Sequence, residues 1–75
     1  MSPSKEDYIK NIFKDIEERG YSLNKDLSFY LKVSKPSVTE MIKKLSEEGL
    51  VYVENQKIYL TRDGEKIAKK LISIH

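Results

Sequence analysis

The stretch NKDLSFYLKVSKPSVTEMIKKLSEEGL, residues 24–50, decides the fold because its apolar residues repeat at the spacing of one helix face on either side of a short break. The pattern predicts a helix at residues 25–32 and a second helix at residues 36–48. Two short helices separated by the turn at residues 33–35 form the arrangement called a helix-turn-helix.

Cap residues support both helix starts. Asn24 is the predicted N-cap of the first helix, because an asparagine oxygen accepts hydrogen bonds from the first free backbone N–H groups. The second helix is capped by Ser34 or by Lys35. Serine is a good cap residue, whereas Pro36 favours the first helical position and would make Lys35 the cap.

After Gly49 the hydrophobic period changes from that of a helix to that of a strand. Residues 50–54 and 57–60 are rich in β-branched and aromatic side chains, and two residues separate them, which predicts a β-hairpin. Asn55 tolerates a positive φ at the first turn position. Gln56 fits the second position poorly, so we expect a turn looser than the Asn-Gly type.

Further helices flank this unit on both sides. Residues 5–19 place their apolar side chains on one face, with Ser4 and Asp7 as a capping box at the start and Gly20 at the end. A last helix begins at Thr61, which is a good N-cap. The order helix, helix, helix, hairpin, helix predicts a winged helix-turn-helix, a mostly α fold with a small β-hairpin.

The aromatic residues indicate packing rather than stacking on nucleic-acid bases. Tyr52 and Tyr59 are expected to pack against each other across the hairpin. Tyr8, Phe13 and Phe29 are expected in the core or at its edge. This pattern argues against binding of single strands, which uses exposed aromatic side chains along a groove.

Composition excludes several classes of protein. The chain has 75 residues, enough for one domain at residues 1–75, with no cysteine and one histidine, and we expect no enzyme. No apolar run approaches the ~20 residues of a membrane span, so we expect a cytoplasmic protein without a membrane partner. The net charge is only +2, and a nucleic-acid site would need basic residues that cluster in three dimensions.

In a helix-turn-helix the second helix faces outward, with its N-terminal residues toward base edges. Here that helix carries hydroxyl side chains first and lysines later, which suit bases and phosphates. The Thr39 methyl can contact a thymine methyl, and Glu40 can accept from cytosine N4 or lie near a lysine. The predicted DNA-contacting residues are Ser34, Lys35, Pro36, Ser37, Thr39, Glu40, Lys43, Lys44 and, after the hairpin turn, Lys57.

Two other interpretations of these residues stay open. Polar residues form an ordinary solvated face on most helices. A winged helix can also serve as a protein–protein docking module without reading DNA. Such a docking face would expose an apolar patch of more than a few hundred Å², whereas a DNA-reading face should carry small polar residues and lysines. The residues favour duplex DNA binding.

Four strings of the chain carry a family resemblance: SKEDYI at residues 4–9, VSKPSVTEMIKKL at 33–45, LTRDG at 60–64 and KLISIH at 70–75. Together they resemble the N-terminal DNA-binding domain of the diphtheria-toxin-repressor family, closest to its manganese-responsive branch. The resemblance covers essentially the whole chain in register, and the second string is the most specific of the four.

The resemblance implies a metal-dependent transcriptional repressor, with the third helix in the major groove of double-stranded DNA and the hairpin near the flanking backbone. Family members bind palindromic operators as dimers. A second domain, after the position of His75, supplies dimerisation and most metal ligands. This chain lacks that domain, so it is either a fragment or a natural single-domain relative. We therefore expect at most a weak homodimer on an operator half-site, and Mn²⁺ or Fe²⁺ as a cofactor only in a full-length parent.

The family resemblance implies metal ligands at two positions of this chain. The resemblance implies Asp7 and His75 as ligands, and a further glutamate ligand of some members is replaced here by Lys10. From the residues alone, Asp7 suits the first turn of a helix and His75 suits a solvated helix end. Two donors at opposite ends of a chain make no metal site without others, so we expect an incomplete site.

Overall fold

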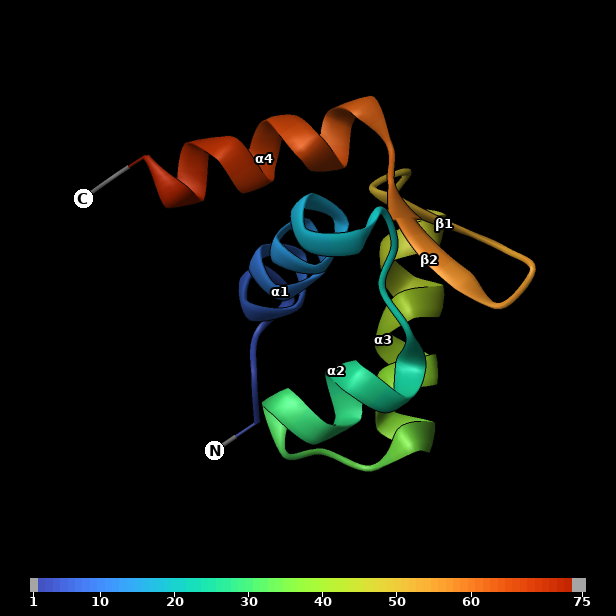
Figure 1. The fold of residues 1–75 in the computed structure, drawn as a ribbon. Coiled ribbons are helices and arrows are strands. Elements are labelled where there is room, and N and C mark those ends of the chain that lie inside the picture. Colours follow the sequence, from blue (N-terminus) through green and yellow to red (C-terminus); the bar gives the residue numbers. More distant parts are fainter. Residues whose placement is uncertain (1, 74–75) are drawn as a thin grey trace.

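The structure, a computed structural model, describes residues 2–73 (Figure 1). Its elements follow the predicted order and form a winged helix-turn-helix. The helices and strands are α1 (Lys5–Arg19), α2 (Asn24–Leu31), α3 (Lys35–Glu47), β1 (Val51–Glu54), β2 (Lys57–Leu60) and α4 (Arg62–Ile72). We call the hairpin of β1 and β2 the wing. It projects from the helices, so that its tip lies well away from α1 and α4 (Figure 1).

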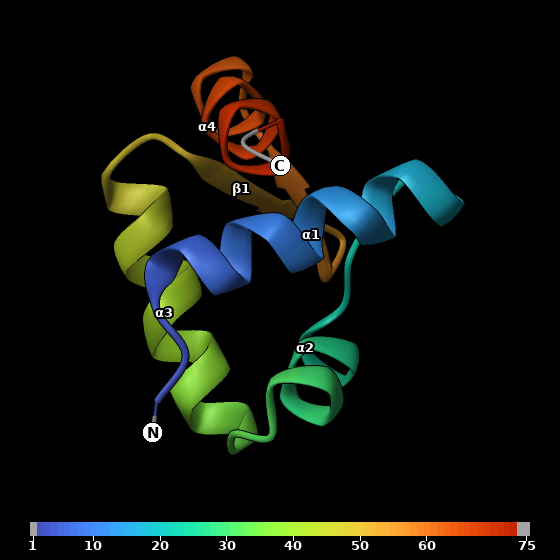
Figure 2. The same cartoon turned by 90° about the vertical axis from the view of Figure 1, so that its left-hand side faces the viewer.

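Helix α1 runs through the middle of the fold, with α4 along one side of it and the α2–α3 pair on the other (Figures 1 and 2). All six elements contribute to one apolar core. Burying each large apolar side chain stabilises the fold by about 1.5–3 kcal/mol, more than an exposed ion pair does. The buried core residues are Tyr8, Ile9, Ile12, Leu27, Val38, Ile42, Leu45, Val51, Ile58 and Ala68.

The limits of α1 confirm the prediction from its cap residues. Ser4 Oγ accepts from the Asp7 N–H, and Asp7 Oδ2 accepts from the Ser4 N–H at 2.9 Å, which completes the capping box. Gly20 ends the helix with a φ of 94°, in the left-handed region that glycine adopts without a Cβ clash. Local sequence therefore determines this helix at both ends.

Helix α2 differs from the prediction at its start. Leu23 is the N-cap and makes no side-chain hydrogen bond, so the prediction of Asn24 as the cap is wrong. Asn24 is the first helical residue, and its side-chain amide donates to Thr39 and to the Lys35 carbonyl of α3 instead of capping α2. The helix ends at Leu31, one residue before the predicted end, and Lys32 takes a left-handed φ of 57°.

The wing turn is tighter than predicted. The strands pair antiparallel with Val51 opposite Leu60 and Glu54 opposite Lys57, so β1 starts one residue after the predicted position. Asn55 and Gln56 have φ values of 51° and 66°. Two positive φ values are those of a type I′ turn, which matches the twist of the strands. The expectation of a looser turn at Gln56 is therefore wrong.

The base of the wing is fastened to α4 and to the segment before α2. Backbone hydrogen bonds join Ser22 and Ile58 in both directions, at 2.9 and 2.8 Å. The Thr61 hydroxyl donates to the Gly49 carbonyl at 2.6 Å. An added Cβ at Gly64 would lie 2.0 Å from the Leu50 carbonyl oxygen, so only glycine permits this close approach of α4. These contacts fix the direction in which the wing projects.

Candidate nucleic-acid interface

The start of α3 is built from exposed hydroxyl groups and a proline. Ser34 is the N-cap, and its Oγ accepts from the Ser37 N–H at 3.2 Å. The helix begins at Lys35, one residue earlier than predicted, and Pro36 occupies the second helical position, where no intrahelical partner for its nitrogen is needed. Ser34 and Ser37 also share a hydrogen bond of 2.9 Å between their hydroxyl oxygens. Of the two predicted caps, Ser34 is the one observed.

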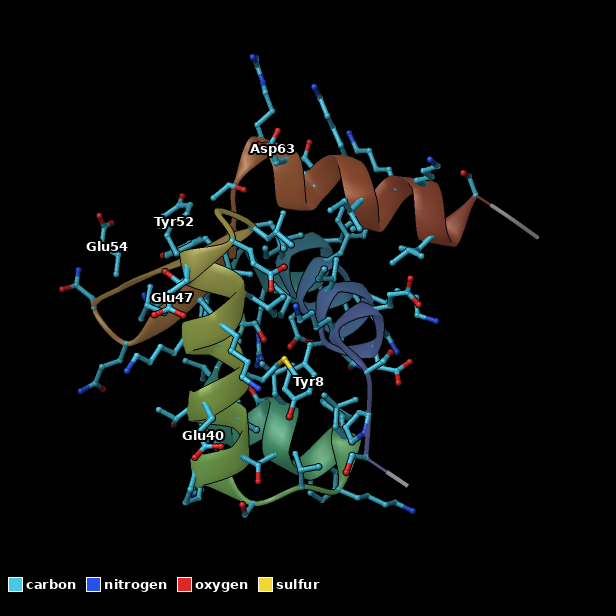
Figure 3. All side chains as sticks on the ribbon, turned by 180° about the vertical axis from the view of Figure 1, so that it is seen from behind. Tyr8, Glu40, Glu47, Tyr52, Glu54 and Asp63 are labelled. Carbon is cyan, nitrogen blue, oxygen red and sulfur yellow. The ribbon has the colours of Figure 1, made fainter. Side chains whose placement is uncertain are left out.

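Further along α3, the predicted site residues lie on the side opposite the core. Val38, Ile42 and Leu45 are buried, as a helix spacing of three and four residues requires. The predicted contact residues between and beyond them are all exposed to solvent, and Glu40 points away from the body of the molecule (Figure 3). The exposed residues of this face are Ser34, Lys35, Pro36, Ser37, Thr39, Glu40, Lys43 and Lys44.

The lysines of α3 form no ion pairs within the described residues. Within residues 2–73, ion pairs join Lys5 with Glu48, Lys10 with Asp7, Arg19 with Asp15 and Asp26, and Lys69 with Glu65. None of them includes Lys35, Lys43 or Lys44. Although the net charge of the chain is only +2, the outward face of α3 therefore presents three lysines without an ion partner within these residues. Such a face can neutralise phosphates.

Acidic residues lie on the same side of the molecule. Glu40 and Glu47 project from α3, and Glu54 projects from the wing (Figure 3). Glu40 forms no ion pair within the described part of the chain, so no lysine neutralises it there. A free carboxylate repels phosphates but accepts from the cytosine amino group. For a phosphate, this side of the molecule therefore combines attraction by the α3 lysines with local repulsion by Glu40.

Lys57 of the wing is held against the protein. Its Nζ lies 4.7 Å from the centre of the Tyr21 ring, and the Arg19 guanidinium carbon lies 5.3 Å from the same ring. The hydrogen bond from Arg19 to Asp26 raises the pKa of the guanidinium, which stays charged. Sequence reasoning missed Tyr21, because it lies in the segment between two helices and contacts the wing only in the folded chain.

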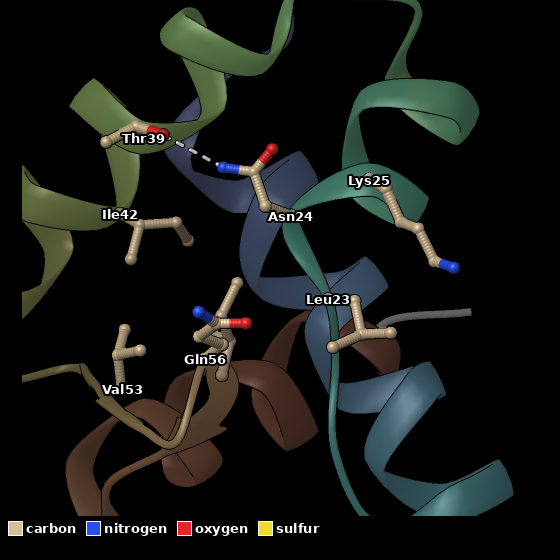
Figure 4. A pocket seen from close by; sticks show the side chains of 8 residues that line it. Leu23, Asn24, Lys25, Thr39, Ile42, Val53 and Gln56 are labelled. Carbon is tan, nitrogen blue, oxygen red and sulfur yellow. Dashed lines mark hydrogen bonds between the residues drawn. The ribbon is translucent and has the colours of Figure 1, made fainter.

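Thr39 is hydrogen-bonded to α2, which the sequence also did not predict. Asn24 Nδ2 donates to Thr39 Oγ1 at 2.9 Å, and Thr39 Oγ1 donates to the Lys35 carbonyl at 3.1 Å. Both residues border a groove of about 590 Å³ between α2, α3 and the wing (Figure 4). The groove is lined by Leu23, Asn24, Lys25, Thr39, Ile42, Val53, Gln56 and Ile58.

The aromatic residues follow the prediction in the wing and depart from it in α2. Tyr52 and Tyr59 stack across the two strands, with their ring centres 5.1 Å apart. Phe29 is 77% exposed, so its placement in the core or at its edge is wrong. Because α2 has only two turns, Leu27 and Leu31 suffice to cover its inner side, and Phe29 packs edge-to-face on the exposed Tyr30.

The candidate metal ligands do not form a metal site within residues 2–73. Asp7 Oδ2 is occupied by the Ser4 N–H, and Asp7 Oδ1 lies 4.0 Å from Lys10 Nζ. No group of three or more histidine, cysteine, aspartate or glutamate side chains that could hold a metal ion exists among these residues. His75 lies outside the described residues. The donors within residues 2–73 therefore do not by themselves fit a bound Mn²⁺ or Fe²⁺, which needs several oxygen or nitrogen ligands.

Comparison with known proteins identifies the class of this interface. Residues 1–59 match the family model described as iron dependent repressor, N-terminal DNA binding domain. The chain belongs to this family, which confirms the resemblance found in its four strings. Family and fold together make it a DNA-binding domain of transcriptional repressors that depend on a metal.

The relatives agree with the manganese-responsive branch of the resemblance. The chain is 43% identical over 75 residues to the HTH-type transcriptional regulator MntR of Bacillus velezensis, covering 99% of this chain and 53% of the relative. It thus spans about half the length of the curated relatives it matches. This relative is, by its name, a transcriptional regulator.

Solved structures have the same fold. The IdeR of T. acidophilum superposes with a TM-score of 0.91 at 30% identity, covering 96% of this chain and 34% of that protein. The manganese regulator SloR superposes with a TM-score of 0.83 at 40% identity, over 96% of this chain and 34% of its own. In the part of the chain described here, no helix is long and apolar enough to cross a membrane.

Proposed function

We propose that residues 1–75 act as one DNA-reading domain of a metal-responsive transcriptional repressor, located in the cytoplasm where its operator lies. Helix α3 enters the major groove, with Ser34, Pro36 and Ser37 near base edges and Lys43 and Lys44 on phosphates. The wing follows the flanking backbone. One chain binds one half-site of a palindromic operator, and two chains bind the complete operator as a homodimer.

A single observation carries this proposal: the outward face of α3 combines exposed hydroxyl groups with lysines that no carboxylate within residues 2–73 neutralises. The arrangement suits a polyanion, because each phosphate that a lysine neutralises releases a counterion. Family membership supports DNA as that polyanion.

The competing function, docking of another protein on α3, has less support. Within the described chain, the exposed large apolar residues lie on α2, the wing and α4 and not on α3. A protein-docking helix would present such residues on its outward face. They are Phe29, Tyr30, Tyr52, Val53 and Ile72.

Metal dependence belongs, in this proposal, to the whole regulator. Asp7 caps the start of its own helix, and residues 2–73 contain no cluster of side chains with enough ligand atoms to hold a metal ion. Mn²⁺ or Fe²⁺ would act in a full-length protein through ligands beyond this stretch. DNA binding by the 75-residue chain should therefore not change when either metal is added or removed.

The test is a titration of the purified chain onto a library of DNA duplexes at two salt concentrations, with and without Mn²⁺, followed by sequencing of the bound fraction. We expect an enriched half-site, weaker binding at high salt and no effect of Mn²⁺. Absence of enrichment together with salt-independent binding would contradict DNA reading and favour protein docking. An increase in affinity on adding Mn²⁺ would contradict the placement of the sensor outside this stretch.

A further inference from the structure

Asn24 of α2 and Thr39 of α3 form a polar contact at the edge of the groove (Figure 4). The Asn24 amide nitrogen donates to Thr39 Oγ1 at 2.9 Å and lies 3.4 Å from the Lys35 carbonyl oxygen, to which it also donates. Thr39 Oγ1 donates its own hydrogen to the same carbonyl at 3.1 Å. The threonine hydroxyl is therefore committed to partners inside the protein.

This commitment fixes the orientation of the Thr39 side chain. Threonine in a helix populates two side-chain rotamers, because its hydroxyl can donate a hydrogen bond to a backbone carbonyl of the preceding turn. A second hydrogen bond from Asn24 favours the rotamer in which the hydroxyl faces α2. In Figure 4 the Thr39 oxygen faces Asn24 and the methyl carbon lies on the other side. The methyl group is thus the free end of an exposed side chain.

The amide of Asn24 is itself locked in one orientation. Its Oδ1 atom is buried and has no hydrogen-bond partner. Exchanging oxygen and nitrogen would bring the oxygen against the Lys35 carbonyl oxygen and would bury an N–H group where the oxygen now lies unpartnered. A buried unpaired acceptor lowers stability. The unpaired oxygen therefore offsets part of the stability that the hydrogen bonds of the Asn24 N–H groups contribute.

We propose that Asn24 is a positioning residue for DNA specificity: it holds the Thr39 rotamer so that the threonine methyl, rather than its hydroxyl, faces a thymine methyl in the major groove. This inference rests on the proposed function and deepens it, since it assigns one base preference to one side chain. Apolar contact with the thymine methyl is an established mode of base reading. Asn24 contacts no base and acts through Thr39.

The experiment compares four variants of the 75-residue chain: Asn24→Ala, Thr39→Ser, Thr39→Val and the double variant Asn24→Ala/Thr39→Val. Each is titrated onto the half-site selected from the library and onto duplexes in which every thymine is replaced in turn by uracil, which lacks the methyl group. Valine carries a methyl group at both γ positions, so its contact does not depend on which rotamer Asn24 selects.

We expect Thr39→Ser to abolish the preference for thymine over uracil at one position, and Asn24→Ala to reduce it about two- to fivefold, in keeping with a single apolar base contact. Thr39→Val should keep the preference, and the double variant should recover what Asn24→Ala loses. A merely structural role of Asn24 would not be rescued by valine.

Ser28→Ala is the matched control, because the Ser28 hydroxyl also joins α2 to the following turn, through the Val33 carbonyl, without contacting Thr39. It should leave the thymine preference unchanged. Thermal unfolding should show less than about 4 °C of loss for Asn24→Ala, since removal of the unpaired oxygen offsets the lost hydrogen bonds.

A second measurement does not involve DNA. In the free chain, nuclear Overhauser contacts and couplings of the Thr39 methyl should report one rotamer in the wild type and two in Asn24→Ala. The inference is overturned if Thr39 occupies two rotamers in the wild type, if Asn24→Ala keeps the full thymine preference, or if valine fails to restore it. Absence of any base preference in the wild type would instead overturn the proposed function, and this inference with it.

Discussion

The outward face of α3 and the first turn of α1 are two regions that the sequence marks as candidate sites, and the structure treats them in opposite ways. On α3 the lysines stay free of ion pairs within the described chain. At the start of α1 the capping box uses Asp7, and its remaining oxygen lies near Lys10. Charged residues thus indicate an external partner only where no ion pair or hydrogen bond within the protein already occupies their side chains.

The serine hydroxyl groups at the starts of α1 and α3 show the same contrast between occupied and available side chains. Ser4 caps α1 and Ser34 caps α3, so the Oγ atom of each accepts a hydrogen bond from a backbone N–H of the first helical turn. Around Ser4 the reciprocal carboxylate closes the cap. Around Ser34 the next hydroxyl belongs to Ser37, which stays exposed and retains capacity for a base or phosphate. The residue types are similar, and the neighbours decide which region is available.

The largest expected effect comes from removing both free lysines of α3. Lys43→Ala/Lys44→Ala should weaken DNA binding by roughly tenfold or more and lower the salt slope by about two, because two phosphates are no longer neutralised. Affinities measured over a series of salt concentrations give this slope. Lys66→Ala/Lys70→Ala on α4 removes the same charge and should leave the slope unchanged. Equal effects in both double variants would place the DNA elsewhere.

Glu40→Ala should change which sequence is bound more than how tightly random DNA is bound. Loss of an acceptor for cytosine N4 should cost about 1 kcal/mol of discrimination, while binding to nonspecific DNA should strengthen because a repulsive carboxylate is gone. Library selection with the variant gives the preference, and a random duplex gives the background affinity. Glu47→Gln, which removes a charge later in α3, is the control and should shift only the background. An unchanged selected sequence would remove Glu40 from base reading.

Asp7→Ala should destabilise the fold without affecting DNA binding. Loss of the capping box costs about 1 kcal/mol, or roughly 4–8 °C in the melting temperature of a domain of this size. Thermal unfolding and DNA titration measure the two effects separately. Asp7→Asn retains a side-chain oxygen that can accept and should recover most of the stability. A large loss of DNA affinity in the folded variant would show that the two regions are coupled.

Lys10→Glu tests whether the replaced lysine alone prevents metal binding. A second carboxylate three residues from Asp7 should lower stability by a few tenths of a kcal/mol through repulsion between like charges. Millimolar Mn²⁺ should raise the melting temperature of neither the variant nor the wild type, because Asp7 stays in its capping box. A metal-dependent rise in the variant would mean that one substitution completes a site in this chain.

The smallest effect concerns pH and lies on the buried side of α1. Burial raises the pKa of the Tyr8 phenol above its ordinary value of about 10. The folded state therefore holds this proton more tightly than the unfolded state, and Tyr8 contributes stability that is complete below about pH 10 and falls as pH rises through the folded pKa. Thermal unfolding between neutral and strongly alkaline pH should show a steeper decline for the wild type than for Tyr8→Phe. Identical profiles would contradict the burial argument.

Local patterns predicted much of the fold and of the site. The capping box at Ser4, a cap at Ser34 or Lys35, the cap at Thr61 and the change of period after Gly49 predict the order of the elements. Where the predicted limits differ from the structure, they differ by one residue. The outward face of α3 follows from the same helix spacing. These features depend on residues a few positions apart, so the amino-acid sequence contains all that they require.

Local sequence patterns do not predict contacts between segments that lie far apart in the chain. Asn24 was predicted to cap its own helix but bonds α3, and Lys57 lies over Tyr21 in another segment. The apolar side chain of Phe29 predicts a place near the core, yet two leucines already cover the inner side of the short helix. Each error arose because a side chain with several possible partners takes the one that the packed chain brings closest.

The sequence by itself determined the class of fold, the family and the residues that can face DNA, because helix periods, caps and turns act over one or two turns of backbone. Only the tertiary structure decided which of those residues are free. It left the α3 lysines free of ion pairs within residues 2–73, closed Asp7 into its cap, and turned the Thr39 hydroxyl toward Asn24. The physical reason is that hydrogen bonds and ion pairs reach only a few Å, so their partners are known only once distant segments have packed together.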